Sequence, residues 1–591
     1  MAKVDLTIEI CGMSGDGTIA AGGMLNQAMS LAGFSVLAFD SYPAEIRGFG
    51  RCVTRSRFSD RSLLALEDVA DVLISLDDEQ SLSRMPFLSP AGVVFFDNQP
   101  PTHLPEDKSL AAHVTPDMKL LGVPFQDLAT AAAGSSRGKN LAALGALAAW
   151  YGLDPDLFHR VIEGKFSAKG EKVLAANQKS FDAGYEYLNR ELAERKPHPL
   201  DAPPQTEGPE KILLSGNQAV GDAALAAGLK NYFGYPITPA TPIMEYLAKK
   251  LPKKGGRVVQ MEDEISAIGA VLGSFFGGAR AMTATSGPGF ALMTELITHG
   301  VMSETPAVIV DAQRGGPATG LPTKTEQSDL LAAVYGGPGD SSRIVLAPTS
   351  VAECFDLVAK SFRLAEKFQT PVVVLSDFYL NNRVENLAPP KVAAEDLADG
   401  TVRPGPEDQK GYLRYRLTES GISPRALPGM EGFEYAATGL EHSERGNPEY
   451  APDNHMAMSQ KRRRKLLGAL SELPAPEVHG PDGPLALGVM SWGSTWGSVW
   501  EAVEMAREMG LAVGALKVVS LYPFHAEVIR SFLHRADQVL IPELNLEGQL
   551  AVLLGHLQRK EASRLNLVTG VPISPTVILN KIKEILGVDE K

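Results

Sequence analysis

The sequence predicts an α/β protein made of three doubly wound units, each with a parallel sheet covered by helices. Short apolar runs typical of buried strands alternate with segments whose apolar residues recur at helical spacing, and this alternation restarts twice along the chain. At 591 residues and 63.1 kDa, the chain is also too long for a single hydrophobic core. We therefore expect several α/β domains joined by irregular segments.

The first unit is expected over residues 1–190. Residues 4–10, VDLTIEI, have the composition of a buried strand, and the loop 12–17, GMSGDG, leads into a segment with small and apolar residues at helical spacing. Further strands are expected at 71–75 and 92–96, and helical patterns fill the stretch that follows. A strand, a glycine-rich turn and a helix in this order are typical of the start of a parallel α/β domain.

The other two units are expected over 211–390 and 481–591. Before them, residues 191–210 are rich in proline and charge and lack periodicity, which is typical of an interdomain linker. Residues 391–480 also lose the pattern, so we expect an irregular connecting segment suited to wrapping a neighbouring surface. The strands expected in the second unit are 211–214, 257–260, 281–285, 306–311 and 371–376.

The charge balance argues against a nucleic-acid or anionic-membrane partner, because 56 Lys and Arg stand against 70 Asp and Glu, a net charge of −14. The one basic run, KRRRK at 461–465, lies at the start of a predicted helix, and we interpret it as a solvated or subunit-facing patch. No apolar run approaches the roughly 18 residues of a membrane span, and the N-terminal residues lack the pattern of a secretory signal. These features favour a cytoplasmic protein.

The cysteines and the first glycine-rich loop carry little chemical information. Cys11, Cys52 and Cys354 are too few and too far apart for a disulfide framework, a CxxC site or a four-cysteine iron–sulfur cluster. The loop 12–17 has GxxGxG rather than GxGxxG spacing. Close packing of strand and helix explains these glycines as well as phosphate binding does.

Residues 235–242, YPITPATP, form an unusually stiff segment. Each proline fixes its own φ and moves the preceding residue out of the helical region, so Tyr235, Thr238 and Thr241 are biased towards extended geometry. Thr241 and Pro242 are predicted as the N-cap and the first residue of the next helix. A simple helix stop and restart explains the prolines, and presentation of Thr238 to a ligand is the alternative.

Glu264 lies on the apolar face of a helix predicted within QMEDEISAIGAVLGSFFGG, residues 260–278. The residues three, four, seven and eight positions further on are Ala267, Ile268, Val271 and Leu272. A carboxyl on such a face must be paired, or must become neutral through a raised pKa. Glu262 and Asp263 fall elsewhere, at the helix start, where acids favour the macrodipole. Capping or buffering by water is the alternative to a functional role for Glu264.

Two further loops directly follow predicted strands. TSGPGF at 285–290 leads into a helix, and DAQRGGPATGLPT at 311–323 contains Arg314 followed by two glycines. Both loops leave the carboxyl ends of parallel strands, the edge on which open α/β sheets bind ligands. The guanidinium of Arg314 offers a fork of donors suited to a carboxylate, although a loop arginine taken alone is usually just solvated.

In this order, YPITPATP, MEDEISAIGAVLG, TSGPG and QRGGPATGLPT resemble the alpha subunit of 2-oxoacid:ferredoxin oxidoreductases, thiamine-diphosphate enzymes that convert a 2-oxoacid and coenzyme A to an acyl-CoA. The resemblance implies that Glu264 is the catalytic carboxyl, which hydrogen-bonds the aminopyrimidine ring of thiamine diphosphate. It also implies that Thr238 and Arg314 contact the substrate. The further cofactor-binding residues that it implies are Ile237, Pro239, Ser286 and Gly287.

Other parts of the chain resemble other parts of the same family. GMSGDGTIAAGG and SYPAEIRGFG resemble its gamma domain, here fused ahead of alpha, so residues 1–190 are expected to be gamma-type. Residues 211–390 are expected to be the pyrimidine-binding domain, and 481–591 a transketolase C-terminal-like domain. The fusion and TGLEHSERG at 438–446 are most similar to 2-oxoglutarate enzymes. This implies conversion of 2-oxoglutarate to succinyl-CoA, CO2 and reduced ferredoxin, which a strong reductant could reverse.

The chain departs from single-chain family members in its metal ligands. Gly15-Asp16-Gly17 is not the magnesium motif of thiamine enzymes, because residues 40–47, DSYPAEIR, lack the required Asn. With too few cysteines for a cluster as well, the chain is assigned no metal ligand. Mg2+ and a [4Fe-4S] cluster are expected in a separate beta subunit, within an (alpha-beta)2 assembly that passes electrons to ferredoxin.

Two alternatives to this function stay open. The substrate could be another 2-oxoacid, such as pyruvate, a branched-chain oxoacid or an aryl pyruvate. The chain could also be a non-catalytic scaffold that docks an electron carrier through its N-terminal domain. The scaffold hypothesis predicts that Thr238, Glu264 and Arg314 scatter over the surface, whereas the enzyme hypothesis predicts that they converge on one cleft.

Overall fold

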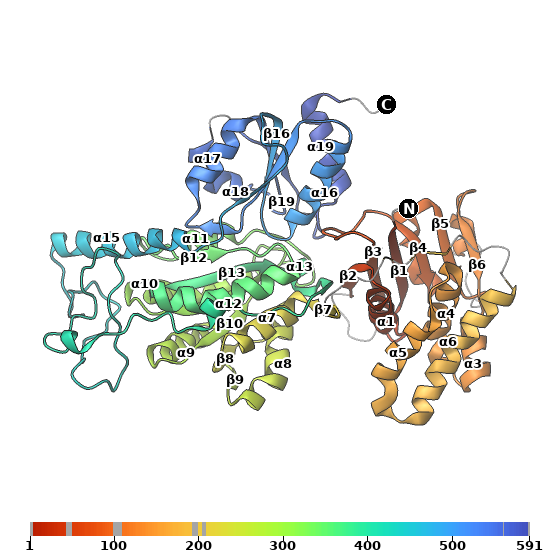
Figure 1. Cartoon of the computed structure of the whole chain (residues 1–591), viewed down its shortest axis with the longest axis horizontal. Coiled ribbons are helices and arrows are strands. Elements are labelled where there is room, and N and C mark those ends of the chain that lie inside the picture. Colours follow the sequence, from red (N-terminus) through yellow and green to blue (C-terminus); the bar gives the residue numbers. More distant parts are fainter. Residues whose placement is uncertain are drawn as a thin grey trace. The chain divides into compact units, whose positions relative to one another are not determined.

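The computed structural model of the chain describes residues 4–42, 50–98, 109–191, 199–201, 203, 209–558 and 561–588 (Figure 1). Most of the expected linker 191–210, and residues 43–49 of the SYPAEIRGFG motif, lie outside the described residues. The chain folds into two compact units, Met1–Leu214 with Arg383–Pro389, and Ser215–Asn382 with Pro390–Lys591. Three mixed sheets, each with parallel strands and surrounding helices, confirm the α/β class.

The first unit contains an eight-stranded sheet with the order β6-β5-β4-β1-β3-β2-β14-β7. Its strands are β1 (Asp5–Met13), β2 (Ser35–Ser41), β3 (Arg51–Ser59), β4 (Ala70–Ser75), β5 (Leu88–Phe96), β6 (Lys119–Gly122), β7 (Ile212–Ser215) and β14 (Val384–Leu387). The strands β1, β4, β5 and β6 are parallel, whereas β3 runs antiparallel to both β1 and β2. Only half of this sheet therefore has the parallel arrangement expected from the sequence.

The strand expected at 211–214 exists as β7, but its assignment to the second unit is wrong. It forms the edge of the first sheet, next to β14, which itself pairs with β2. An apolar run of four residues predicts a strand but contains nothing that selects the sheet edge with which it pairs. Two strands that lie far apart in the sequence, β7 and β14, thus complete the first sheet.

Helices of the first unit pack closely where glycine allows it. They are α1 (Thr18–Leu31), α2 (Asp78–Leu82), α3 (Phe125–Ala133), α4 (Lys139–Tyr151), α5 (Pro155–Phe166) and α6 (Glu171–Glu191). A Cβ on Gly145 of α4 would lie 2.0 Å from the carbonyl oxygen of Phe181, and one on Gly184 of α6 would lie 1.9 Å from that of Ala142. The two helices therefore meet backbone to backbone, which only glycine permits.

The side chain of Asp16 forms polar contacts within and next to the glycine-rich loop 12–17. The carboxylate of Asp16 accepts a hydrogen bond from the Met13 N–H at 2.8 Å and forms an ion pair with Lys139 at 2.7 Å. The side-chain amide of Asn140 donates to the Gly17 carbonyl. These contacts favour close packing of strand and helix over phosphate binding as the reason for the glycines.

The second unit holds two sheets. The larger has the order β18-β12-β13-β11-β10-β8-β9 and is parallel except for β18. Its strands are β8 (Asn231–Gly234), β9 (Arg257–Gln260), β10 (Ala281–Thr285), β11 (Ala307–Gln313), β12 (Ile344–Leu346), β13 (Pro371–Asp377) and β18 (Ser520–Tyr522). The smaller has the order β15-β17-β16-β19-β20, with β15 (Glu477–His479), β16 (Leu485–Ser491), β17 (Val513–Lys517), β19 (Ala536–Glu543) and β20 (Ser563–Asn566). Four of the five strands expected in the middle of the chain are confirmed within the larger sheet.

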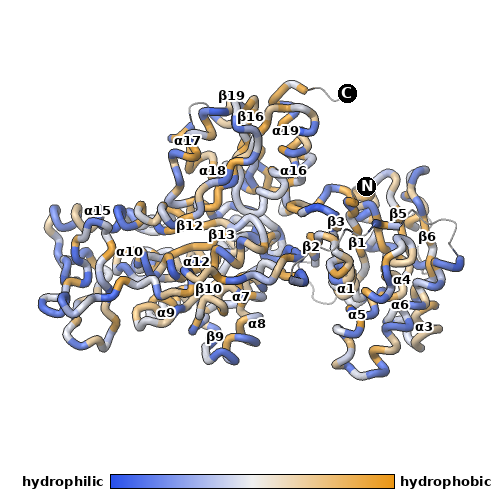
Figure 2. Tube along the Cα trace, in the orientation of Figure 1, coloured by the Kyte–Doolittle hydropathy of each residue, from blue (hydrophilic) through white to orange (hydrophobic). Residues whose placement is uncertain are grey.

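The core of the larger sheet lies along its central strands. Every residue of β10, β11 and β13 is buried, and β12 and β13 are coloured hydrophobic in Figure 2. The helices of this unit are α7 (Gly216–Ala226), α8 (Thr241–Lys250), α9 (Glu264–Phe276), α10 (Gly287–Met302), α11 (Leu330–Tyr335), α12 (Val351–Phe368), α13 (Phe378–Asn382), α14 (Ala394–Leu397), α15 (Pro452–Gly468), α16 (Thr495–Glu508), α17 (Ala526–Arg535), α18 (Gln549–Leu553) and α19 (Pro575–Leu586). Among the described residues, none of the helices has the length and hydropathy needed to cross a bilayer.

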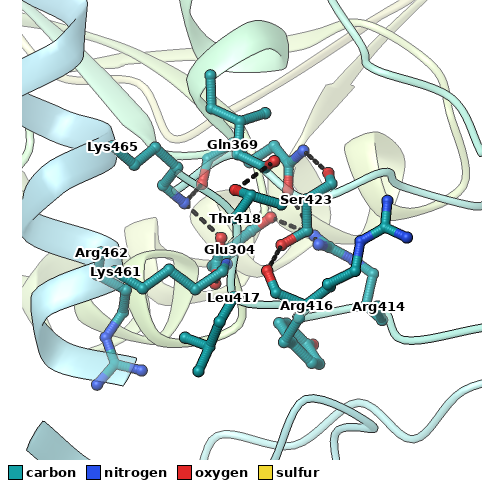
Figure 3. A network of polar contacts seen from close by, with 12 residues as sticks. Glu304, Gln369, Arg414, Arg416, Leu417, Thr418, Ser423, Lys461, Arg462 and Lys465 are labelled. Atoms are coloured by element: carbon teal, nitrogen blue, oxygen red, sulfur yellow. Dashed lines mark hydrogen bonds and ion pairs between the residues drawn. The ribbon is translucent and has the colours of Figure 1, made fainter. Parts of the chain in front are cut away.

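The basic run 461–465 is largely internal, which corrects its interpretation as a solvated or subunit-facing patch. It lies in the second half of α15 rather than at a helix start, and its i, i+4 spacing places Lys461 and Lys465 on one buried face. Figure 3 shows both lysines directed at Glu304, which is fully buried. Only Arg463 and Arg464 of the run are exposed. The lysines serve as counter-charges for a buried acid.

Candidate active site

Four of the loops singled out in the sequence leave adjacent strands of the larger sheet at one edge. The strands β9, β8, β10 and β11 are neighbours and parallel, so their carboxyl ends meet. The segment YPITPATP follows β8, Glu264 follows β9, the Ser-Gly-Pro-Gly turn follows β10 and Arg314 follows β11. This is the edge at which open α/β sheets bind ligands.

The segment after β8 presents Thr238 at the surface. Its side chain is exposed, Ile237 is half-buried and Pro239 is buried. The helix α8 starts one residue earlier than expected, because Ala240 is its N-cap and Thr241 is its first residue. The predicted N-cap role of Thr241 is therefore wrong, since no side chain caps this helix.

Arg314 connects this segment to the loop after β11. Its Nη1 donates a hydrogen bond to the carbonyl oxygen of Thr238 at 2.8 Å. The side chain of Arg314 is 7% exposed, and its Nε has no hydrogen-bond partner among the described residues. Burial lowers the pKa of this guanidinium, and the charge of Asp329 opposes that effect. Thr238 and Arg314, both predicted to contact the substrate, are thus brought together.

Glu264 is the first residue of α9 and is 5% exposed. It enters the helix directly after Asp263, whose carboxylate caps the N-terminus by accepting from the Ser266 N–H at 2.7 Å. Glu264 shares its buried face with Ala267, Ile268, Val271 and Leu272, as its spacing predicted, and with Phe275. Burial, together with the nearby charge of Asp263, raises the pKa of Glu264. The carboxyl is consequently poised to exchange a proton nearer to neutral pH than an exposed glutamate.

The turn after β10 lies against the Glu264 carboxyl. A Cβ on Gly289 would lie 2.3 Å from Glu264 Oε1 and 2.2 Å from Thr285 Oγ1, so no larger residue fits there. Ser286 is fully buried, and its hydroxyl has no partner among the described residues. Gly287 begins α10, and its Cβ position is 2.8 Å from Asp329 Oδ2. The turn therefore touches Glu264 on one side and Asp329 on the other.

Asp311 and Asp329 were missed in the sequence. Asp311 lies within the buried strand β11, and Asp329 precedes α11 in a polar stretch, so neither position stands out. Asp311 could have been noticed because it lies in an apolar strand three residues before Arg314. Burying a carboxyl is unfavourable unless it is paired or has a specific role. The charge of Asp329 acts on the guanidinium of Arg314, and Asp329 in turn raises the pKa of the buried Asp311.

Large apolar side chains are exposed around this edge. Tyr235, Ile265, Leu292 and Leu321 are each 42–52% exposed. They come from the same four loops and helix starts that carry the predicted site. Among the described residues, no group of three or more His, Cys, Asp or Glu side chains could hold a metal ion.

Family models match most of the chain. Residues 7–187 match "Pyruvate ferredoxin/flavodoxin oxidoreductase", residues 222–461 match "Pyruvate flavodoxin/ferredoxin oxidoreductase, thiamine diP-bdg", and residues 486–571 match "Pyruvate:ferredoxin oxidoreductase core domain II". The 2-oxoglutarate oxidoreductase subunit KorA of Mycobacterium tuberculosis is 34% identical, over 96% of this chain and 89% of the relative. The chain belongs to the 2-oxoacid:ferredoxin oxidoreductase family.

Two further relatives place the chain within that family. The subunit alpha of 2-oxoacid:ferredoxin oxidoreductase 2 from Aeropyrum pernix is 31% identical, over 100% of this chain and 99% of the relative. A structure of 2-oxoglutarate:ferredoxin oxidoreductase from Magnetococcus marinus, with 2-oxoglutarate, coenzyme A and succinyl-CoA bound, superposes with a TM-score of 0.92 at 37% identity, covering 99% of this chain and 100% of that one. The resemblance drawn from the sequence motifs is confirmed.

Proposed function

We propose that this chain is the gamma-fused alpha subunit of a thiamine-diphosphate-dependent 2-oxoglutarate:ferredoxin oxidoreductase. With a beta subunit it converts 2-oxoglutarate and coenzyme A to succinyl-CoA, CO2 and reduced ferredoxin, and a strong reductant reverses the reaction. One observation carries this proposal: the buried carboxyl of Glu264, which lies against Gly289, and the hydrogen-bonded pair Arg314 and Thr238 occur at the same edge of the sheet. The scaffold hypothesis predicted that these residues would scatter, and it is disfavoured.

The residues around Glu264 fit the aminopyrimidine ring of thiamine diphosphate. The ring needs a carboxyl beside one of its nitrogens, and among the described residues no side-chain hydrogen bond acts on the Glu264 carboxyl. The lack of a side chain at Gly289 makes room for the Glu264 carboxyl itself, and the buried Ser286 hydroxyl, which has no partner among the described residues, can donate and accept a hydrogen bond. When bound, thiamine diphosphate supplies a carbon nucleophile and an electron sink for decarboxylation.

The chain's own residues then have separate roles. Glu264 holds a proton at a ring nitrogen and returns it, which its raised pKa makes easier near neutral pH. Gly287 and Ser286 would help to hold the ring from the start of α10, and Ile237 and Pro239 would do so from the loop after β8. We assign these four residues to cofactor binding.

Arg314 and Thr238 are assigned to the 2-oxoacid. The buried guanidinium of Arg314 donates one N–H to the Thr238 carbonyl, and its other N–H groups can donate to a carboxylate. The exposed Thr238 side chain offers a hydroxyl next to the same position. Together they hold the carboxylate and carbonyl end of the substrate above the sheet.

A partner subunit completes the site in this proposal. The whole sequence has three cysteines, fewer than a [4Fe-4S] cluster needs, so we assign the cluster and Mg2+ to a beta subunit in an (alpha-beta)2 assembly in the cytoplasm. The exposed Tyr235, Ile265 and Leu292 around the site supply an apolar rim for that subunit. We assign residues 1–190 as gamma-type, 211–390 as pyrimidine-binding apart from β7 and β14, which belong to the first sheet, and 481–591 as transketolase C-terminal-like, with 191–210 and 391–480 as connecting segments.

The choice of 2-oxoglutarate rests on the relatives' names. The Mycobacterium tuberculosis and Magnetococcus marinus proteins are named for 2-oxoglutarate, whereas the Aeropyrum pernix protein is named for 2-oxoacids in general. The test is to co-purify the chain with its beta subunit and to assay a panel of 2-oxoacids with coenzyme A and a viologen dye. We expect the highest kcat/KM with 2-oxoglutarate. Preference for pyruvate, a branched-chain oxoacid or an aryl pyruvate would overturn the assigned substrate. If no 2-oxoacid in the panel supported reduction of the dye, the proposed activity itself would be overturned.

A further inference from the structure

A cavity of about 310 Å³ lies in the second unit, and among the described residues none of those assigned to the cofactor or the 2-oxoacid lines it. The helix α9 contributes Gly269 and Gly273 to its wall, and the expected connecting segment 391–480 contributes Arg414 and Arg425. A Cβ on Gly273 would meet open space, so this side of α9 leaves room for a ligand. Thr438, the first residue of the TGLEHSERG motif, also lines the cavity.

Arg425 is buried in this wall without a counter-ion. It is 3% exposed, and among the described residues the only hydrogen bond of its guanidinium runs from Nη2 to the carbonyl oxygen of Phe275. The carboxylate of Glu366, whose charge acts on Arg425, accepts instead from Nε and Nη2 of Arg280 at 2.9 and 2.7 Å. A buried guanidinium normally has an anionic partner, because removing its charge from water is costly.

Arg414 adds a second buried positive charge to the same wall. It is 2% exposed, and it donates from Nη1 to Gln369 Oε1 at 2.9 Å and from Nη2 to the backbone carbonyl of Glu304 at 2.8 Å (Figure 3). Both acceptors are uncharged. The carboxylate of Glu304 is bound by Lys461 and Lys465. Among the described residues, this one buried acid therefore stands against four buried cations, the two lysines and the two arginines.

The excess positive charge is carried by the two arginines. Arginine stays protonated at neutral pH, and burial together with the charge of Arg414 lowers the pKa of Arg425 only to about 10. Burial lowers the pKa of Lys465 to about 7, although the charge of Glu304 raises it. Lys461 then suffices to balance Glu304, so Arg414 and Arg425 are left without a negative charge of their own.

A neighbouring cavity, which Arg425 also borders, contains arginines that already have acidic partners. Arg280 is paired with Glu366 at 2.7 Å, and Arg403 is paired with Asp399 at 2.9 Å. An anion in the first cavity would instead meet two arginines that have no such partner.

We propose that the first cavity binds a small phosphate monoester, whose phosphate group lies between Arg414 and Arg425 as their counter-ion. Guanidinium groups bind phosphate oxygens through paired N–H donors, and a dianion can neutralise two of them. Phe276 and Tyr435, whose rings meet edge to face at 6.3 Å, line the same cavity and offer aromatic surface to the apolar part of the ester. Ligand pockets span roughly 300–1,000 Å³, so a cavity of about 310 Å³ suits a small molecule.

The test is titration calorimetry of the full chain at pH 7 with phenyl phosphate, inorganic phosphate and succinate. The cavity is lined by this chain's own residues, so the result does not depend on the activity proposed above. We expect phenyl phosphate to bind most tightly, because it has both a dianionic phosphate and a ring. Inorganic phosphate that binds as tightly would overturn the ester, and succinate that binds as tightly would overturn phosphate as the ligand class. If none of the three binds, the site itself is overturned.

Variants locate the bound phosphate. Arg425→Met removes one guanidinium, and Gly273→Leu fills the cavity but keeps both guanidinium groups, so each is expected to weaken phenyl phosphate binding by at least about tenfold. Because Arg425 has no counter-ion to lose, ligand-free Arg425→Met should unfold near the wild-type temperature. Arg403→Met, at the neighbouring cavity, should bind phenyl phosphate as wild type does. Wild-type affinity in Arg425→Met or in Gly273→Leu, or an equal loss of affinity in Arg403→Met, overturns the proposal.

Discussion

Arg314 Nη1 and the carbonyl oxygen of Thr238 are 2.8 Å apart, although the two residues are separated by 76 positions in the sequence. This hydrogen bond joins the loop after β8 to the loop after β11, across the intervening strand β10. The arginine is therefore oriented before any ligand arrives. Preorganisation of this kind reduces the entropy lost when a substrate is bound.

Arg314→Ala should raise the KM for 2-oxoglutarate and lower kcat/KM, because it removes a charge-assisted pair to a carboxylate and the tether to Thr238. The expected loss in kcat/KM corresponds to about 2–5 kcal/mol. Steady-state kinetics of the assembled complex measure it. The matched control is Arg257→Ala, which alters an exposed arginine at the amino end of β9 and should leave kcat/KM unchanged. Equal kinetics for the two variants would remove Arg314 from the site.

Gly289→Ala should disturb the Glu264 carboxyl directly, since the new methyl group would lie 2.3 Å from Glu264 Oε1. We expect the chain to lose about 1–3 kcal/mol of stability through overpacking and to bind thiamine diphosphate more weakly in the complex. Thermal unfolding and calorimetry measure the two effects. Gly273→Ala in α9 is the control, because a Cβ there meets open space. A Gly289→Ala protein as stable as this control would contradict the close contact.

Glu304→Gln should destabilise the fold by about 3–5 kcal/mol, because it leaves Lys461 and Lys465 buried without their counter-charge (Figure 3). Although burial raises it, the pKa of Glu304 is held below its ordinary value of 4.5 by Lys461, Lys465 and Arg414. A lowered carboxyl pKa adds stability above pH 4.5 that is lost as the pH falls through the folded value. The thermal midpoint of Glu304→Gln should thus lie below that of wild type at pH 7, and the gap should narrow in acid. Glu295→Gln, an exposed acid on α10, should match wild type, and a Glu304→Gln midpoint equal to it would contradict this account.

The chain expressed alone should contain no stoichiometric iron and should turn over no 2-oxoacid. Its three cysteines cannot ligate a four-iron cluster, and electrons would have no acceptor within the chain. Iron analysis and a viologen assay, before and after addition of the beta subunit, test this. About four irons per isolated chain would show that the cluster was assigned to the wrong subunit.

The sequence predicted those parts of the site that depend on local pattern. Glu264 could be placed on a buried helix face because its apolar neighbours recur at helical spacing, and β10 and β11 are apolar runs of strand length. The pairing of β7 with β14, and of Lys461 and Lys465 with Glu304, could not be predicted in this way. Those contacts join segments more than 150 residues apart, and nothing in the local pattern of either segment names its partner. For the same reason, the environment of Asp311 and Asp329 could not be predicted, because it is set by residues that are close in space but not in sequence.

The most direct test of the account is the exchange rate of the C2 hydrogen of thiamine diphosphate bound to the assembled complex, measured in deuterium oxide for wild type, Glu264→Gln and Glu262→Gln. Glu264→Gln keeps the volume and a hydrogen-bonding amide but loses the titratable proton, so exchange should slow by about 10²–10⁴-fold while cofactor binding weakens only modestly. Glu262→Gln, two residues earlier and outside α9, should exchange at nearly the wild-type rate. Wild-type exchange in Glu264→Gln, or slower exchange in Glu262→Gln than in Glu264→Gln, would contradict the assignment of Glu264 as the catalytic carboxyl.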